Sequence, residues 1–440
     1  MSGTRGLLLL VLVSFQSLAA PQIQTWQTDN GAHVLFLPAT EIPMLDVRIV
    51  FDAGSARDHG LSGLAVLTNG LLVEGAAGRN SQAIAEEFES VGAQVDYSAA
   101  RDMAVLGVRS LTEARYLEKA LAVLKQVLTQ PDFPEDAYQR ELNRMKVSVK
   151  ARQQSPAAIA SEAFYKALYR DHPYATPVSG TKESLERMTR QAVLDFYRQY
   201  YVAANATVAI VGNVSREQAE KIVAELLAGL PAGEKAAPLP AVKPLQKAEK
   251  IVIEYPSAQT HIYVGQPGVK RGDPDYMALY VANHIFGGSG FASRLMQVVR
   301  EENGLAYSVY SYFSPMREQG PFAMGMQTKN SQTDQALALL NEELEKYVAE
   351  GPSEDELEAS LSNITGGFPL NIDSNGKLLD YIAMIGFYNL PTDYLDKFIP
   401  EVSKVTVDKI NDALKRRIHP QKMVTVIVGK AVNRKAVNSE

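Results

Sequence analysis

Residues Gly60–Leu72 have the sequence GLSGLAVLTNGLL, which is the most informative part of the chain. Its dense apolar content predicts a helix over residues 61–73. Gly70 within that helix costs roughly 1 kcal/mol relative to alanine. Val66 and Gly70 offer no lone pair to a metal ion, and the amide of Asn69 is too weak a base to activate water.

A second informative run is Phe286–Tyr310, FGGSGFASRLMQVVREENGLAYSVY, in which Arg300 and Tyr307 stand seven residues apart. A guanidinium and a phenol O–H can both donate to a carbonyl oxygen on which negative charge develops, and one preorganised donor lowers the barrier by about 3–4 kcal/mol. On spacing alone, a surface arginine and a core tyrosine are ordinary. The pair therefore needs support from the surrounding sequence.

The same run opens with a glycine-rich turn formed by Gly287, Gly288, Ser289 and Gly290. Such a turn could cradle a phosphate, but it lacks the Lys-Ser/Thr ending of a P-loop and does not match G-x-G-x-x-G. A flexible turn is therefore the local interpretation.

These runs resemble the signatures of the pitrilysin/insulinase family of inverzincin zinc peptidases. Gly60–Leu72 is similar to the family's Gly-Leu-Ala-His-x-x-Glu-His-Met helix, and Phe286–Tyr310 to its Ser-Arg-Leu and Arg-x-x-x-Gly-Leu-Ala-Tyr-Ser motifs. Pro173–Thr181, PYATPVSGT, resembles its His-Pro-x-x-x-Pro-x-x-Gly-Thr turn. The resemblance covers most of the chain.

The resemblance implies that the zinc site is lost from this chain. Val66 and Gly70 stand where the family has its two histidine ligands, and Asn69 stands where it has the general-base glutamate. The third ligand, a glutamate on a later helix, would fall at Val147 or Ser148. No metal is expected here, and zinc is expected in a partner subunit.

The resemblance also assigns roles to the second run. Arg300 and Tyr307 match a pair that, in the family, reaches the active site from the domain facing the zinc. Gly287–Gly290 is similar to the glycine-rich, substrate-contacting loop of the non-zinc subunit of mitochondrial processing peptidase. We therefore expect the zinc-free partner subunit of a secreted heterodimeric metallopeptidase, as in bacterial heterodimeric relatives, which acts on an extended peptide. The alternative is a non-catalytic structural or peptide-binding protein of the same fold.

The order of predicted elements indicates an α+β fold built from two tandem halves, each a mainly antiparallel sheet packed with a block of helices. The strand at 206–212, ATVAIVG, recurs as VTVIVG, whose final glycine, Gly429, stands 217 residues after Gly212. We expect a first domain at 20–228, a proline-rich linker at 229–250 and a second domain at 251–440.

Residues 1–19 resemble a secretory signal peptide, with Arg5 before the apolar run Leu7–Phe15 and cleavage expected after Ala19. A periplasmic or secreted protein is expected. The formal net charge of −6 argues against nucleic acid as a partner, and the absence of cysteine excludes disulfides and an N-terminal lipid anchor. None of the six histidines has metal-ligand spacing; Asp58 and His59 come nearest, and a solvated loop is expected there.

Overall fold

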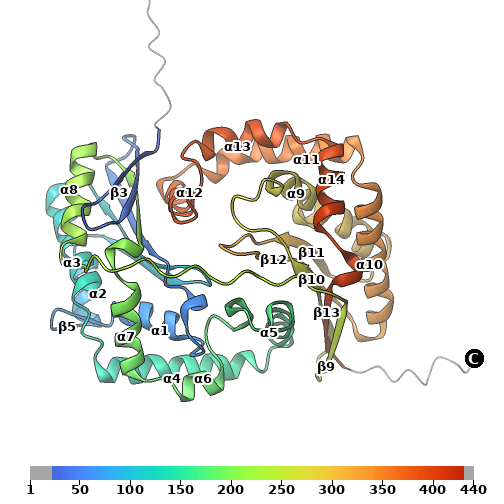
Figure 1. Ribbon diagram of the computed structural model, residues 1–440, viewed down its shortest axis with the longest axis horizontal. Coiled ribbons are helices and arrows are strands. Elements are labelled where there is room, and N and C mark those ends of the chain that lie inside the picture. The colour runs from blue at the N-terminus through green and yellow to red at the C-terminus, as the bar shows by residue number, and fades with distance from the viewer. Residues whose placement is uncertain (1–21, 431–440) are drawn as a thin grey trace, which may run out of the picture.

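The computed structural model describes residues 22–430, and its architecture is α+β (Figure 1). The predicted signal peptide lies outside the described residues. Two sheets stand side by side, each with helices against it, as the sequence predicted. Among the described residues, no helix is both long and apolar enough to cross a membrane.

The first sheet has six strands in the order β1-β2-β8-β3-β7-β6. Their bounds are β1 Gln24–Gln27, β2 His33–Pro38, β3 Met44–Phe51, β6 Gln94–Ala99, β7 Ala104–Leu111 and β8 Ala206–Gly212. The helices of this half are α1 Leu64–Leu71, α2 Ser81–Glu89, α3 Ala114–Thr129, α4 Glu135–Arg152, α5 Pro156–Tyr169, α6 Lys182–Glu186, α7 Arg190–Tyr200 and α8 Arg216–Leu227. A small hairpin joins β4 Gly75–Ala76 to β5 Arg79–Asn80.

The second sheet has five strands in the order β11-β12-β10-β13-β9. Their bounds are β9 Glu249–Glu254, β10 Gln259–Pro267, β11 Ser308–Phe313, β12 Pro321–Lys329 and β13 Val424–Gly429. The main helices are α9 Tyr276–Asn283, α10 Thr333–Glu350, α11 Glu354–Gly367, α12 Asn375–Phe387, α13 Tyr394–Ser403 and α14 Val407–Arg417.

The two sheets repeat one topology. The order β2-β8-β3-β7-β6 in the first matches β9-β13-β10-β12-β11 in the second, and in each the first two strands are the parallel pair. The remaining neighbours are antiparallel. The chain is therefore an internal duplication, to which the first half adds β1, a strand that the sequence patterns did not predict.

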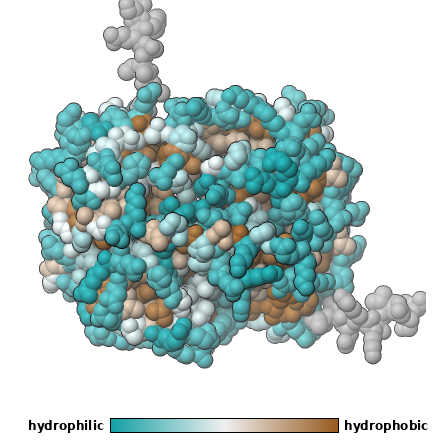
Figure 2. All heavy atoms as spheres, viewed as in Figure 1, coloured by the Kyte–Doolittle hydropathy of each residue, from teal (hydrophilic) through white to brown (hydrophobic). Residues whose placement is uncertain are grey.

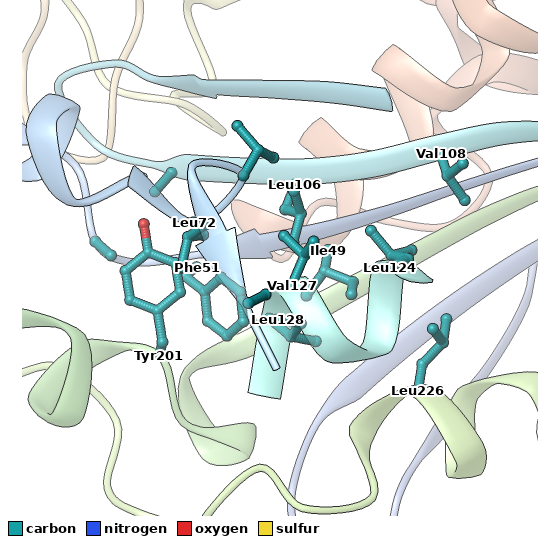
Figure 3. Packing of buried hydrophobic residues seen from close by; sticks show 14 of the residues in the cluster. Ile49, Phe51, Leu72, Leu106, Val108, Leu124, Val127, Leu128, Tyr201 and Leu226 are labelled. Atoms are coloured by element: carbon teal, nitrogen blue, oxygen red, sulfur yellow. The ribbon is translucent and has the colours of Figure 1, made fainter. Parts of the chain in front are cut away.

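Alternating side chains of each strand pack on opposite faces of the sheet. In β2, Val34 and Phe36 join the helices of the first half, whereas Leu35 and Leu37 turn to the other face. Figure 3 shows the first of these cores, where Phe51 lies next to Tyr201 with ring centroids 4.7 Å apart. Period-2 apolar patterning explains why the strand positions were predictable.

The second face of each sheet is covered by a helix from the opposite half. Helix α12 packs on β8 and β3 of the first sheet, and α5 packs on β10 and β13 of the second. Gly386 of α12 approaches so closely that a Cβ there would lie 2.3 Å from Leu35 Cδ1. This exchange joins the two halves through apolar contacts.

A buried carboxylate at the seam joins the halves through hydrogen bonds. Asp102, in the turn between β6 and β7, accepts from the hydroxyls of Tyr174 at 2.5 Å and Tyr388 at 2.9 Å. It also accepts from the backbone N–H of Arg317 at 2.7 Å. Tyr388 and Arg317 belong to the second half, so the turn of one sheet holds the chain of the other.

The connection between the halves is attached to the protein body. Residues 231–247 form no regular element, but Leu239, Val242 and Leu245 are buried against the core between α5 and the second sheet. The proline-rich segment is therefore a packed strap. On the face of the molecule shown in Figure 2, most of the surface is hydrophilic.

Candidate functional site

Helix α1 is the element on which a metal would have to bind, and its exposed face carries no ligand. Val66 and Gly70 stand four residues apart on one face of the helix, and both are half-buried. A Cβ added at Gly70 would meet no atom within 4 Å, so open space lies beside this position. The two positions share a face, as metal ligands on one helix must, but they offer no donor atom.

Asn69 turns inward and is fully used by the fold. It is 1% exposed, its amide N–H donates to the carbonyl of Val105 on β7 at 3.1 Å, and its Oδ1 accepts from the hydroxyl of Tyr201 at 2.9 Å. Burial raises the pKa of Tyr201 well above its usual range, so the phenol stays protonated as the donor. Asn69 thus fastens α1 to β7 and to the segment after α7.

The start of α1 is capped by a buried carboxylate, and the expectation of a solvated loop at Asp58 is wrong. Asp58 is 3% exposed and accepts from the backbone N–H groups of Gly63 and Ala65, both at 2.8 Å. Burial raises the pKa of Asp58 to about 7, while these backbone hydrogen bonds oppose the rise. His59 remains exposed and pairs with the Tyr200 hydroxyl at 2.6 Å.

The position of the third ligand offers nothing to a metal either. Val147 and Ser148 lie on exposed positions of α4, and Val147 is 70% exposed. Within residues 22–430, no group of three His, Cys, Asp or Glu side chains could hold a metal ion. The donor set around α1 therefore does not fit zinc.

Arg300 and Tyr307 lie together in the second half, next to β11, the edge strand of its sheet. Arg300 belongs to the π-helical segment η6, Met296–Glu302, and Tyr307 directly precedes β11. The Arg300 guanidinium carbon lies 5.4 Å from the ring centre of Tyr307 and 4.9 Å from that of Phe291. The guanidinium thus makes cation–π contacts with two aromatic rings, which favour this position of the side chain.

The side-chain donors of Arg300 and Tyr307 have no hydrogen-bond acceptor in the described part of the chain. No carboxylate there forms an ion pair with Arg300, and the Tyr307 hydroxyl has no hydrogen-bond partner. Tyr307 is 76% exposed and Phe291 is 68% exposed. Large aromatic side chains usually lie in the core, so the exposure of these two rings is unusual for their residue type.

Two family models match the chain, and together they span most of it. The model described as "Insulinase (Peptidase family M16)" matches residues 37–182, and "Peptidase M16 inactive domain" matches residues 187–364. A crystal structure described as a peptidase M16 inactive domain from Pseudomonas fluorescens is 38% identical with a TM-score of 0.90, covering 93% of this chain and 98% of that one. The chain belongs to the M16, or insulinase, family of peptidases.

Two curated relatives match along nearly their whole length. A Bacillus subtilis protein named "Uncharacterized zinc protease YmxG" is 25% identical over 412 residues, which are 93% of this chain and 99% of that protein. A Helicobacter pylori protein named "Non-peptidase homolog YmxG" is 26% identical over 429 residues, which are 96% of this chain and 98% of that protein. The M16 family thus includes relatives named as proteases and as non-peptidases.

In this M16 chain the glycine-rich run begins as the end of a helix and continues into a short turn, where only a turn was expected. His284–Gly288 forms a π-helical turn, η4, and Gly290–Ala292 forms a 3-10 turn, η5. A Cβ at Gly287 would lie 2.5 Å from Ser311 Oγ, so glycine permits the close approach to β11. A Cβ at Gly288 would lie 2.6 Å from Asn283 Nδ2. Gly287 is buried, Ser289 is half-buried, and Gly288 and Gly290 are exposed.

Phe291 and Tyr201 were not among the predicted site residues, and Asp58 was predicted only as part of a solvated loop. Phe291, which covers the Arg300 guanidinium, stands in the quoted run but has no motif of its own. Asp58, which precedes α1 in the chain, accepts a hydrogen bond from the backbone N–H of Ala65. Tyr201, which follows α7, donates one to the side chain of Asn69. An aromatic next to a glycine-rich run and an aspartate before a helix start were the available signals for Phe291 and Asp58.

Proposed function

We propose that this chain is the zinc-free partner subunit of a heterodimeric M16 metallopeptidase, and that it supplies Arg300 and Tyr307 to the zinc site of a homologous active subunit. The proposal rests on the contrast between the former zinc positions on α1 and the Arg300–Tyr307 pair in the second half. The ligand positions Val66 and Gly70 and the base position Asn69 cannot support hydrolysis. In contrast, the donor pair is present, with Tyr307 exposed and Arg300 half-buried, and within residues 22–430 neither side chain has a hydrogen-bond or ion-pair partner.

The chemistry of peptide hydrolysis explains what the pair would do. When water attacks a scissile carbonyl carbon, negative charge develops on the carbonyl oxygen. A positioned guanidinium and a phenol O–H can both donate hydrogen bonds to that oxygen. Arg300 is charged throughout the ordinary pH range, and a protonated phenol contributes a second donor. Zinc and its hydroxide would come from the partner, and this chain would contribute only positioned donors.

The proposal includes a partner and a substrate class. An obligate pair should bury about 2,000 Å² or more of surface. The edge of β11, which ends the second sheet and lies next to Tyr307, can accept an extended peptide as an added strand. The relative named as a non-peptidase and the family description as an inactive domain agree with this role. The resemblance of residues 1–19 to a signal peptide supports a pair that acts outside the cytoplasm.

The Tyr307→Phe variant tests the proposal, because it removes one hydroxyl and little volume. In the pair formed with its zinc-bearing homologue, kcat should fall by roughly 10²-fold or more, while KM moves much less. Arg300→Ala should do at least comparable damage. Heterodimer assembly and zinc content of the partner, measured in parallel, should be unchanged.

The matched control is Tyr116→Phe on α3, where Arg115 lies over the ring at 4.4 Å from its centre, as Arg300 lies over Tyr307. This variant should keep full activity. If Tyr307→Phe is equally active, the tyrosine has no part in hydrolysis, and the chain is a scaffold or peptide-binding protein.

A further inference from the structure

A second unspent guanidinium lies at the seam of the two halves. Arg101, in the turn after β6, lines a cavity of about 300 Å³ between α5, the segment that contains the 3-10 turn Pro173–Ala175, and β11. The polar lining comes from residues of both halves: Arg101, Arg152, Ser161, Glu162, Ser179 and Tyr312. The cavity is independent of Arg300 and Tyr307, neither of which lines it.

The Arg101 guanidinium is held in place but not neutralised. Its carbon lies 3.7 Å from the ring centre of Tyr165, and its Nε donates to the carbonyl of Tyr174 at 3.3 Å. No carboxylate in residues 22–430 forms an ion pair with it. One face is therefore stacked and one donor is satisfied, which leaves the two terminal nitrogens available.

The other charges of the lining cancel each other. Arg152 pairs with Glu162, so the pocket keeps one uncompensated positive charge, that of Arg101. A planar guanidinium with a free edge matches the two oxygens of a carboxylate, and the ring beneath it fixes its orientation. Ser161 and Ser179 add two hydroxyls to the lining. The chemistry of this pocket is that of a carboxylate receptor.

The strand geometry relates this pocket to the donor pair. Tyr312 lines the pocket and stands on β11, five residues after Tyr307. Five residues of extended chain span about 17 Å. A peptide added to the edge of β11 would therefore pass Tyr307 and the pocket at positions about five residues apart.

We propose that the Arg101 pocket binds a carboxylate of the peptide substrate about five residues from the residue next to Tyr307, and so contributes to substrate selection. This inference rests on the proposed function for the identity of the ligand as a peptide. The carboxylate can belong to an acidic side chain or to the C-terminus, since both present the same two oxygens.

The test measures binding of fluorescent ten-residue peptides to the full chain alone, without the zinc subunit. One peptide has a free C-terminus and no acidic side chain, its amidated form has no carboxylate, and a third series is amidated with one glutamate moved along the peptide. The peptide with a suitably placed carboxylate should bind roughly 10- to 100-fold more tightly than the peptide without one. The arm that gains affinity identifies the source of the carboxylate.

Variants of Arg101 assign the effect to the pocket. Arg101→Gln should abolish the difference between peptides, and Arg101→Lys should keep only part of it because a lysine cannot form the bidentate contact. Arg115→Gln, which removes another arginine stacked on a tyrosine, should leave the difference intact. Peptides that all bind alike, no binding of any peptide, or a preference that survives in Arg101→Gln would each overturn the inference. A carboxylate preference in the unpaired chain stands even if Tyr307→Phe proves fully active, so the two proposals can fail separately.

Discussion

Removing the carboxylate of Asp102 should loosen the seam between the two halves. Three donors point at it: the hydroxyls of Tyr174 and Tyr388 and the backbone N–H of Arg317. Asp102→Ala leaves Tyr174, which is 0% exposed, with a phenol O–H that has lost its acceptor. Hydrogen bonds to charged groups contribute about 1.5–3 kcal/mol each and are not additive, so we expect a loss of about 3–6 kcal/mol in the free energy of unfolding.

Equilibrium urea unfolding followed by circular dichroism measures this loss through the shift of the midpoint. Tyr388→Phe removes one of the three hydrogen bonds and should cost about 1–2 kcal/mol. The matched control is Asp96→Ala on the same hairpin, whose carboxylate is 54% exposed and pairs with Arg48; it should cost at most about 1 kcal/mol. If Asp102→Ala costs no more than Asp96→Ala, the carboxylate does not hold the seam.

Two further predictions concern helix α1. Asn69→Ala removes the acceptor of the buried Tyr201 hydroxyl and should lower the free energy of unfolding by about 2–4 kcal/mol, measured in urea. Adding Tyr201→Phe to this variant should cost little more, because the two side chains share one hydrogen bond. Fully additive losses would contradict the role given to Asn69. The pKa of Asp58 is about 7 in the folded chain and about 4 in the unfolded chain, so between pH 4 and 7 the folded state binds more protons. The contribution of Asp58 to the free energy of unfolding therefore declines as pH rises from 4 to 7, by up to about 1.4 kcal/mol per pH unit. Asp58→Asn should lack that component when unfolding is measured at pH 5, 6, 7 and 8, and an unchanged pH dependence would show that Asp58 does not titrate there.

Local patterns were sufficient to predict most of the secondary structure and the family. The strand predicted at 206–212 is β8, its repeat ending at Gly429 is β13, and the helix predicted over 61–73 contains α1, Leu64–Leu71. These predictions succeeded because apolar periodicity is a property of short windows. The duplication was also detectable, since the strand ending at Gly212 recurs at Gly429. β1 escaped because its four residues alternate between half-buried and exposed positions without an apolar run.

The M16 fold and the absence of a ligand at the metal positions Val66 and Gly70 can be inferred from sequence alone, because both follow from residue identities within motifs. Three features are visible only in the folded chain. Helix α5 of the first half covers the second sheet while α12 of the second half covers the first sheet, Asn69 holds α1 in place, and no carboxylate within residues 22–430 pairs with the Arg101 guanidinium. These properties depend on contacts between residues tens to hundreds of positions apart. Such contacts leave no period in a short window, because burial and hydrogen-bond satisfaction arise only when the halves pack together.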